Sequence, residues 1–340
     1  MRSFDCPKCG SLLFFENSHC LNCDSEVGFD RQTAAFVLAT PGTRCANTVK
    51  AVCNWLVDTP GELCDSCDLT RTRPNDDDYE GMNAFARAEV AKRRLLYQLD
   101  DLKLPVVDRD EDPERGLAFD LLSSTEGRVT TGHSDGIVTI DMAEGDDGHR
   151  ETLRVRLDEA YRTLLGHFRH ETGHYYWMRL VDEDTAAIPV FRALFGDERA
   201  DYAEALQAHY NSEPAPNWAE THVSIYATAH PWEDWAETFA HYLHICDALQ
   251  TAAAFGVIVA GPEVEAPPDP TAPLTSVPME EVDDFDDLIN SWLPLTYALN
   301  AVNRSMGKKD LYPFVLSPTA LEKLRLVHAL VKRTQPARQR

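Results

Sequence analysis

Two histidines one helical turn apart are the first residues of this sequence that could do chemistry. Residues 170–174 read His-Glu-Thr-Gly-His, within a pattern that predicts a helix over about residues 158–181. On such a helix His170 and His174 share one face and could bind a single zinc ion. Glu171 could then take a proton from the activated water as general base. The motif therefore predicts a hydrolytic zinc site.

Two glutamates further along the chain could supply the third ligand that a catalytic zinc needs. No histidine stands at the metzincin spacing, because residue 180 is Leu. Glu233 and Glu237 lie four residues apart in a predicted helix and share one face. One could bind the metal while the other accepts a hydrogen bond from a histidine ligand. We therefore expect a site of two histidines and one glutamate.

Eight of the nine cysteines lie in the first 67 residues. The first set consists of two C-x2-C pairs: Cys6, Cys9, Cys20 and Cys23. The second set has one such pair and two separated cysteines: Cys45, Cys53, Cys64 and Cys67. Each set could close a four-thiolate zinc site, which leaves no position for water and is structural. The alternative for Cys45 and Cys53 is that they are small buried apolar residues. We expect one catalytic zinc and one or two structural zincs.

The charge of the chain restricts its partners. Its 340 residues include 32 Lys or Arg and 56 Asp or Glu, a formal net charge of −24. Such a field disfavours nucleic acid and anionic lipid. No apolar run approaches the ~18–20 residues of a membrane span, and no secretory h-region is visible. Because the chain has many thiols, we expect a cytoplasmic protein. Its charge leads us to expect neither a nucleic-acid nor a membrane partner.

The sequence predicts an α+β protein in which small zinc-ribbon modules precede a mainly helical domain with a small sheet. We expect the zinc-ribbon region at 1–73, the catalytic domain at 80–258, and a Pro-rich acidic linker or strap at 259–284. The remainder, 285–340, should hold C-terminal helices that pack on the catalytic domain. The zinc-ribbon region lacks a basic patch, so any partner it binds should be a protein.

The histidine motif and a later helix with Glu-x-x-Ala-Glu together resemble the gluzincin metallopeptidases, such as thermolysin-like enzymes and anthrax lethal factor. The resemblance implies that Glu233 binds zinc and that Glu237 holds the first histidine ligand. In the lethal-factor pattern a tyrosine stands seven positions before the ligand glutamate, and Tyr226 occupies that position. Tyr226 is thereby implied to stabilise the oxyanion, with His222 and His230 as rivals for this role.

Most of the chain is also similar to bacterial zinc-binding metallopeptidases with an N-terminal zinc ribbon. The similar stretches are the cysteine pairs and residues 161–171 and 232–238. The resemblance implies a zincin-like catalytic domain but gives no substrate. In zincins an edge strand beside the active-site helix pairs with the extended substrate, and residues 137–140 are our candidate for it. The alternative is an ordinary strand inside the sheet.

These observations predict a zinc metallopeptidase that hydrolyses a peptide or protein substrate, with Glu171 as general base. One alternative is an adaptor that keeps the ligands for stability and binds protein partners through its zinc ribbon. Another is a zinc hydrolase of a non-peptide amide, which needs the same water activation. The presence of both Glu171 and Tyr226 favours an enzyme, because a scaffold needs neither residue.

Overall fold

The computed structural model of the chain describes residues 2–124, 127, 129–145, 163–261 and 284–335. The chain divides into two compact units, Ser3–Tyr176 and the residues from Trp177 onward. We call them the N-terminal and the C-terminal unit and describe each by itself. The strap predicted at 259–284 lies almost wholly outside the described residues, and the predicted domain boundaries stay predictions.

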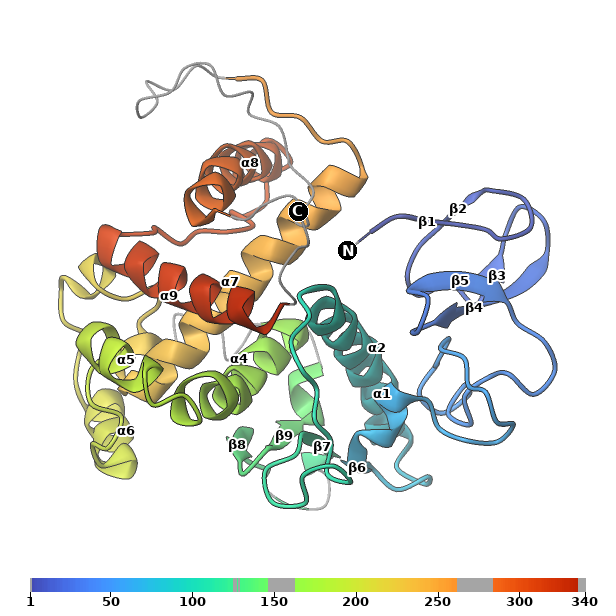
Figure 1. The fold of residues 1–340 in the computed structure, drawn as a ribbon, viewed down its shortest axis with the longest axis horizontal. Helices are drawn as coiled ribbons and strands as arrows, with labels where there is room; N and C mark the ends of the chain where they lie inside the picture. Colours follow the sequence, from blue (N-terminus) through green and yellow to red (C-terminus); the bar gives the residue numbers. More distant parts are fainter. Residues whose placement is uncertain (1, 125–126, 128, 146–162, 262–283, 336–340) are drawn as a thin grey trace. The chain divides into compact units, whose positions relative to one another are not determined.

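The N-terminal unit begins with short antiparallel strands (Figure 1, dark blue). They are β1 (Phe4–Asp5), β2 (Leu12–Leu13), β3 (His19–Cys20), β4 (Ser25–Asp30) and β5 (Ala35–Leu38). On β4, the ring of Phe29 lies within 5.9 Å, centroid to centroid, of the rings of Phe4, Phe15, Phe36, Trp55 and Tyr97. Strands this short bury little area, so this aromatic cluster and the nearby cysteines must stabilise the region.

Helix α2 (Tyr79–Asp101) follows the short helix α1 (Asp65–Asp68) and the strand β6 (Thr70–Thr72). Its first turn is capped by Asp78, whose carboxylate accepts a hydrogen bond from the backbone N–H of Gly81 at 2.8 Å. Good helix formers without Gly or Pro continue the helix to its end. The buried face of α2 is unusual because it includes charged side chains as well as apolar ones.

A four-stranded sheet lies in the same unit, with the strand order β6-β7-β9-β8. Strand β7 (Ala118–Leu122) pairs in parallel with β6 and with β9 (Ile137–Asp141), and β8 (Gly132–Ser134) pairs antiparallel with β9. The prediction that residues 137–140 form an edge strand is therefore wrong, because β9 is paired on both sides. The edge positions in this sheet belong to β6 and β8, each of which is too short to give a recognisable alternating pattern.

The 3-10 turn η2 (Met142–Gly145) ends the sheet region, and helix α4 (Leu164–Trp177) carries the histidine motif. The helical conformation continues as a π-helical turn, η3 (Met178–Asp182), which agrees with the end predicted near residue 181. The predicted start at about residue 158 lies outside the described residues.

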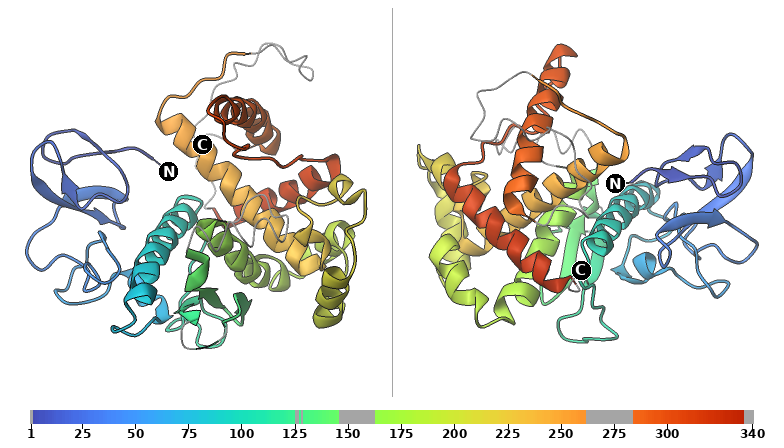
Figure 2. Two further views of the ribbon diagram at one scale, coloured as in Figure 1. Left: turned by 180° about the vertical axis from the view of Figure 1, so that it is seen from behind. Right: turned by 45° about the horizontal axis from the view of Figure 1, so that its top comes forward.

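The C-terminal unit contains helices and turns among its described residues. They are α5 (Ala187–Phe195), α6 (Tyr202–Asn211), η4 (Trp218–Glu220), η5 (Tyr226–Thr228), α7 (Pro231–Ala254), α8 (Phe285–Ser305) and α9 (Pro318–Thr334). Both α8 and α9 pack on the long helix α7 (Figure 2). None of the helices that the structure describes is both long and apolar enough to cross a membrane. The protein is thus mainly helical with small sheets, as predicted.

A buried ion pair joins α7 to α9. The ammonium of Lys323 lies 2.5 Å from a carboxylate oxygen of Asp234, and both side chains are almost completely buried. Lys323 also donates a hydrogen bond to the backbone carbonyl of Thr221 at 2.7 Å. Burial raises the pKa of Asp234 to about 7, an effect that Lys323 only partly offsets.

Lys323→Met should lower the free energy of unfolding by about 3–5 kcal/mol at pH 8, because it leaves a buried carboxylate without its cation. The folded-state pKa of Asp234, about 7, lies above the ordinary value of 3.8. Lys323 lowers this pKa, so the pKa is higher still in the variant. The cost of the ionised form is therefore absent below about pH 4 and increases as the pH rises toward the folded-state pKa. Urea unfolding should accordingly show a smaller loss at pH 5 than at pH 8.

The matched control for this prediction is Lys309→Met, which removes an exposed lysine and should change the unfolding free energy by less than about 0.5 kcal/mol. An equal loss for Lys323→Met at both pH values would show that the Asp234 charge is not the cause.

Candidate metal centres

The first cysteine set is brought together by two tight turns. The sulfur atoms of Cys6, Cys9, Cys20 and Cys23 all lie within 4.8 Å of one another. Two of the sulfur–sulfur distances are 3.7 Å. A tetrahedral zinc site with ~2.3 Å metal–sulfur bonds has edges of ~3.8 Å, so the spacing fits zinc. Gly10, at a φ of 69°, lets the chain turn directly after the first pair.

Hydrogen bonding prepares the first set for a cation. The sulfur of Cys9 lies 3.3 Å from the hydroxyl of Ser11 and accepts a hydrogen bond from the Asn22 amide at 3.5 Å. These interactions lower the pKa of Cys9 to about 5, which favours the thiolate.

The second cysteine set is also brought together, and it is more deeply buried. Its members, all buried, have sulfur atoms within 4.8 Å of one another: Cys45, Cys53, Cys64 and Cys67. The backbone N–H groups of Asn47 and Cys64 point at the sulfur of Cys45, at 3.4 and 3.3 Å. Hydrogen bonding within the set, first from Cys53, lowers the pKa of Cys45. Four clustered sulfurs with backbone donors are a donor set suited to zinc.

The histidine motif lies on a buried face of α4. His170 and His174 are one turn apart with ring centroids separated by 5.0 Å, and Glu171 between them is also buried. Burying two imidazoles and a carboxylate on one helix is costly unless each finds a partner of suitable chemistry. A metal ion on the two imidazoles would be such a partner.

His133, on the edge strand β8, is a neighbour of the motif that sequence reasoning missed. Its ring stacks on that of His174, with a centroid distance of 6.0 Å and an interplanar angle of 24°. Burial and the nearby His174 lower the pKa of His133 to about 3, so its imidazole is neutral at physiological pH. The backbone N–H of Gly136 donates to its Nε2 at 3.1 Å. A single histidine in a hairpin carries no spacing signal that could have revealed it.

The two glutamates lie one turn apart on α7 in the C-terminal unit, and Glu233 is 1% exposed. The hydroxyl of Tyr202 donates a hydrogen bond to Glu233 Oε1 at 2.6 Å. The hydroxyl of Ser224 likewise donates to Glu237 at 2.6 Å. Tyr202 was missed by sequence reasoning because it starts the separate helix α6, far from either motif.

Tyr226 begins the turn η5 and is half-buried, with its ring 6.0 Å from that of His209. Its two rivals have structural partners. His230 caps α7 by accepting a hydrogen bond from a backbone N–H of the first turn. His222 lies 3.6 Å from Asp234. Since both histidines have such roles, Tyr226 remains our candidate for contact with a substrate.

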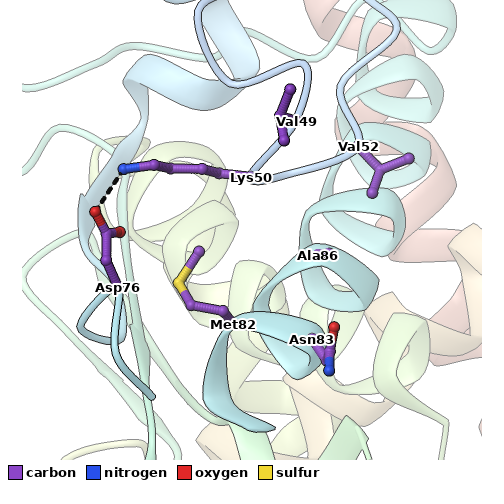
Figure 3. Close-up of a pocket in the computed structure, with 7 residues that line it drawn as sticks. All are labelled: Val49, Lys50, Val52, Asp76, Met82, Asn83 and Ala86. Atoms are coloured by element: carbon purple, nitrogen blue, oxygen red, sulfur yellow. Dashed lines mark hydrogen bonds and ion pairs between the residues drawn. The ribbon is translucent and has the colours of Figure 1, made fainter. Parts of the chain in front are cut away.

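A surface hollow of 370 Å³ in the N-terminal unit contains none of the candidate ligands (Figure 3). It is lined by Val49, Lys50, Val52, Asp76, Met82, Asn83 and Ala86. Its charged groups, Lys50 and Asp76, pair with each other at 2.7 Å. Because these charges already neutralise each other, the hollow is not a candidate for the active site.

The chain has close relatives in mycobacteria. It is 52% identical over 342 residues to proteins described as uncharacterized from Mycobacterium bovis and from two strains of Mycobacterium tuberculosis. The similarity covers 99% of this chain and 97% of each relative. No solved structure matches the chain. Residues 3–78 match a zinc-ribbon domain. Over residues 81–330 the chain belongs to the family described as "Putative zinc-binding metallo-peptidase".

Proposed function

We propose that this protein is a gluzincin-type zinc peptidase that hydrolyses peptide bonds in a peptide or protein substrate. The observation that carries the proposal is the pair of buried imidazoles on α4, inside the part of the chain that matches a zinc-binding peptidase family. We propose Glu233 as the third ligand. Together His170, His174 and Glu233 offer two imidazole nitrogens and a carboxylate oxygen, which suit zinc.

The surrounding residues have separate roles in this proposal. Bound zinc would polarise the scissile carbonyl and lower the pKa of a water molecule to about 7. Glu171 accepts the proton of the attacking water and passes it to the leaving amine. The hydroxyl of Tyr226 donates a hydrogen bond to the oxyanion, and Glu237 orients His170. Tyr202 is a positioning residue, since its hydrogen bond holds the Glu233 carboxylate in one orientation.

Two other functions fit the same ligands. A non-catalytic adaptor would bind protein partners through the zinc ribbon, but it would need neither Glu171 nor Tyr226. A hydrolase of a non-peptide amide would use the same residues with another substrate. We propose that the protein works in the reducing cytoplasm, because eight of its nine cysteines form two groups suited to metal binding.

The wild-type protein should hold about three zinc ions per chain and His174→Ala about two, measured by inductively coupled plasma mass spectrometry. The variant removes one imidazole from the α4 site and leaves both cysteine sets complete. His19→Ala, a histidine outside the candidate ligand groups, is the control and should retain all three ions. If the wild type held two ions and His174→Ala did not change this number, the α4 site would bind no zinc and the adaptor would become the better proposal.

Glu171→Gln should lower peptide cleavage by at least about 100-fold while zinc content and the thermal unfolding midpoint stay unchanged. The amide keeps the size of the side chain but cannot accept the proton. Cleavage of a peptide library, read by mass spectrometry, measures both the loss and the sequence preference. Wild-type rates in Glu171→Gln would remove this residue from the mechanism.

Two tyrosine variants should separate transition-state stabilisation from ligand positioning. Tyr226→Phe should lower kcat about 100-fold without changing zinc affinity, because the lost hydrogen bond is to the oxyanion. Tyr202→Phe should weaken zinc binding about tenfold, because Glu233 loses its hydrogen-bond donor. Chelator competition and steady-state kinetics on both variants give the comparison. If Tyr226→Phe weakened zinc binding and Tyr202→Phe lowered kcat alone, the roles of the two tyrosines would be exchanged.

A further inference from the structure

The second cysteine set, which we call the inner cluster (Cys45, Cys53, Cys64 and Cys67), is bordered by buried charges from α2. Lys92 lies 2.7 Å from Glu89, and both side chains are completely buried. The other carboxylate oxygen of Glu89 is 3.8 Å from the sulfur of Cys67. Arg93, whose side chain is 3% exposed, also lies 3.8 Å from this carboxylate. Three charged side chains on one buried helix face would be very costly without compensation.

The charges of these side chains partly offset the charge of a zinc tetrathiolate. The residues Glu89, Lys92 and Arg93 sum to one positive charge, whereas four thiolates around a divalent zinc carry two negative charges. The combined group then has a single negative charge, smaller than that of the zinc tetrathiolate alone. Arg93 also stabilises the cluster loop, because it donates hydrogen bonds to the carbonyls of Ala51 and Val52 at 3.1 and 3.0 Å. The residues around the inner cluster therefore fit a bound zinc.

Helix α2 also contacts the helix that carries the histidine motif. Gln98, less than two turns after Arg93, accepts a hydrogen bond from the Nε of Arg169 at 3.1 Å. Both side chains are buried, and Arg169 directly precedes His170. The polar contact is thus adjacent to the first candidate ligand of α4.

A second route runs through aromatic rings. The ammonium of Lys92 lies 5.3 Å from the ring centroid of Phe119 on β7. The ring of Phe119 packs edge-on against Phe168 of α4, with a centroid distance of 5.6 Å. Lys92 therefore contacts both Glu89 beside the inner cluster and the aromatic pair that supports α4. Both routes begin on α2 and end on α4, but they use different residues.

We infer that the inner cluster is a positioning element for α4. When zinc is bound there, the cluster loop is ordered, and α2 is held against it by the hydrogen bonds from Arg93 to Ala51 and Val52. Through Gln98 and Phe119, α2 then holds α4 in the position that its histidines need. The positioning of α4 can be tested without any catalytic activity. Its effect on metal binding by His170 and His174 rests on the proposed function. The first cysteine set, in which Cys9 is exposed, should not have this effect.

Hydrogen exchange on the full-length, zinc-loaded protein tests the inference without any activity measurement. Cys53→Ser should speed amide exchange in residues 164–177 about tenfold or more, because the loop beside Cys53 that Arg93 binds loses its metal and α2 loses that support. Cys9→Ser, the matched control in the first set, should leave exchange in α4 unchanged. Unchanged exchange in Cys53→Ser, or an equal increase in Cys9→Ser, would overturn the inference.

A milder variant keeps the inference testable if Cys53→Ser does not fold. Gln98→Met preserves the length of the side chain but cannot accept the hydrogen bond from Arg169. Its matched control on the same helix is Arg94→Gln, which removes a largely exposed ion pair with Glu16. Cobalt(II) reports the sites separately, because thiolate ligands give intense charge-transfer absorption that histidine and carboxylate ligands do not.

Gln98→Met should weaken cobalt binding at the α4 site about tenfold and change its d–d spectrum, while the thiolate bands stay as in the wild type. Arg94→Gln should change neither. Equal cobalt affinity and an identical spectrum in Gln98→Met and the wild type would overturn the inference. If the wild-type α4 site bound no cobalt, the proposed function would fail. Hydrogen exchange of α4 in Gln98→Met would then test the inference by itself, and an exchange rate equal to that of the wild type would overturn it.

Discussion

The neutralisation of buried charge is the constraint on which most of this structure depends. In the N-terminal unit, α2 places Glu89 and Lys92 where neither meets water. In the C-terminal unit, α7 and α9 do the same with Asp234 and Lys323. Each of these groups is tolerable only because a partner of opposite charge is held at short distance. The Asp234–Lys323 pair joins α7 to α9, whereas Glu89 and Lys92 both lie on α2. Burial of these pairs disfavours any packing that would separate a charge from its partner.

The cysteine sets and the histidine motif could be predicted from the sequence because their geometry is local. A C-x2-C pair directs two sulfurs at one point through a single turn, whatever the rest of the fold does. Likewise, two histidines four apart share a face on any α-helix. The mainly helical fold and the end of the α4 helical segment near residue 181 were predictable for the same reason. Both depend on the composition and the spacing of apolar residues within a short stretch of sequence.

The features that sequence reasoning missed depend on contacts between distant residues. Strand β9 looked like an edge strand because its pattern is the same for an edge or an interior position, and only the pairing with β7 and β8 decides. Tyr202 meets Glu233 from 31 positions away, and Lys323 meets Asp234 from 89 positions away. No local rule predicts such pairs, because tertiary packing alone brings them together.

The boundary between the two matched families does not coincide with a boundary in packing. The zinc-ribbon match ends at residue 78 and the peptidase match begins at residue 81, at the start of α2. Yet the buried charges of α2 border Cys67 of the ribbon, and its last turns contact α4. A helix that contacts both the ribbon and α4 cannot be assigned to one of the two matched domains alone. The ribbon therefore covers a buried face of α2, and its removal would expose that face and take from Arg93 the carbonyls of Ala51 and Val52 to which it donates.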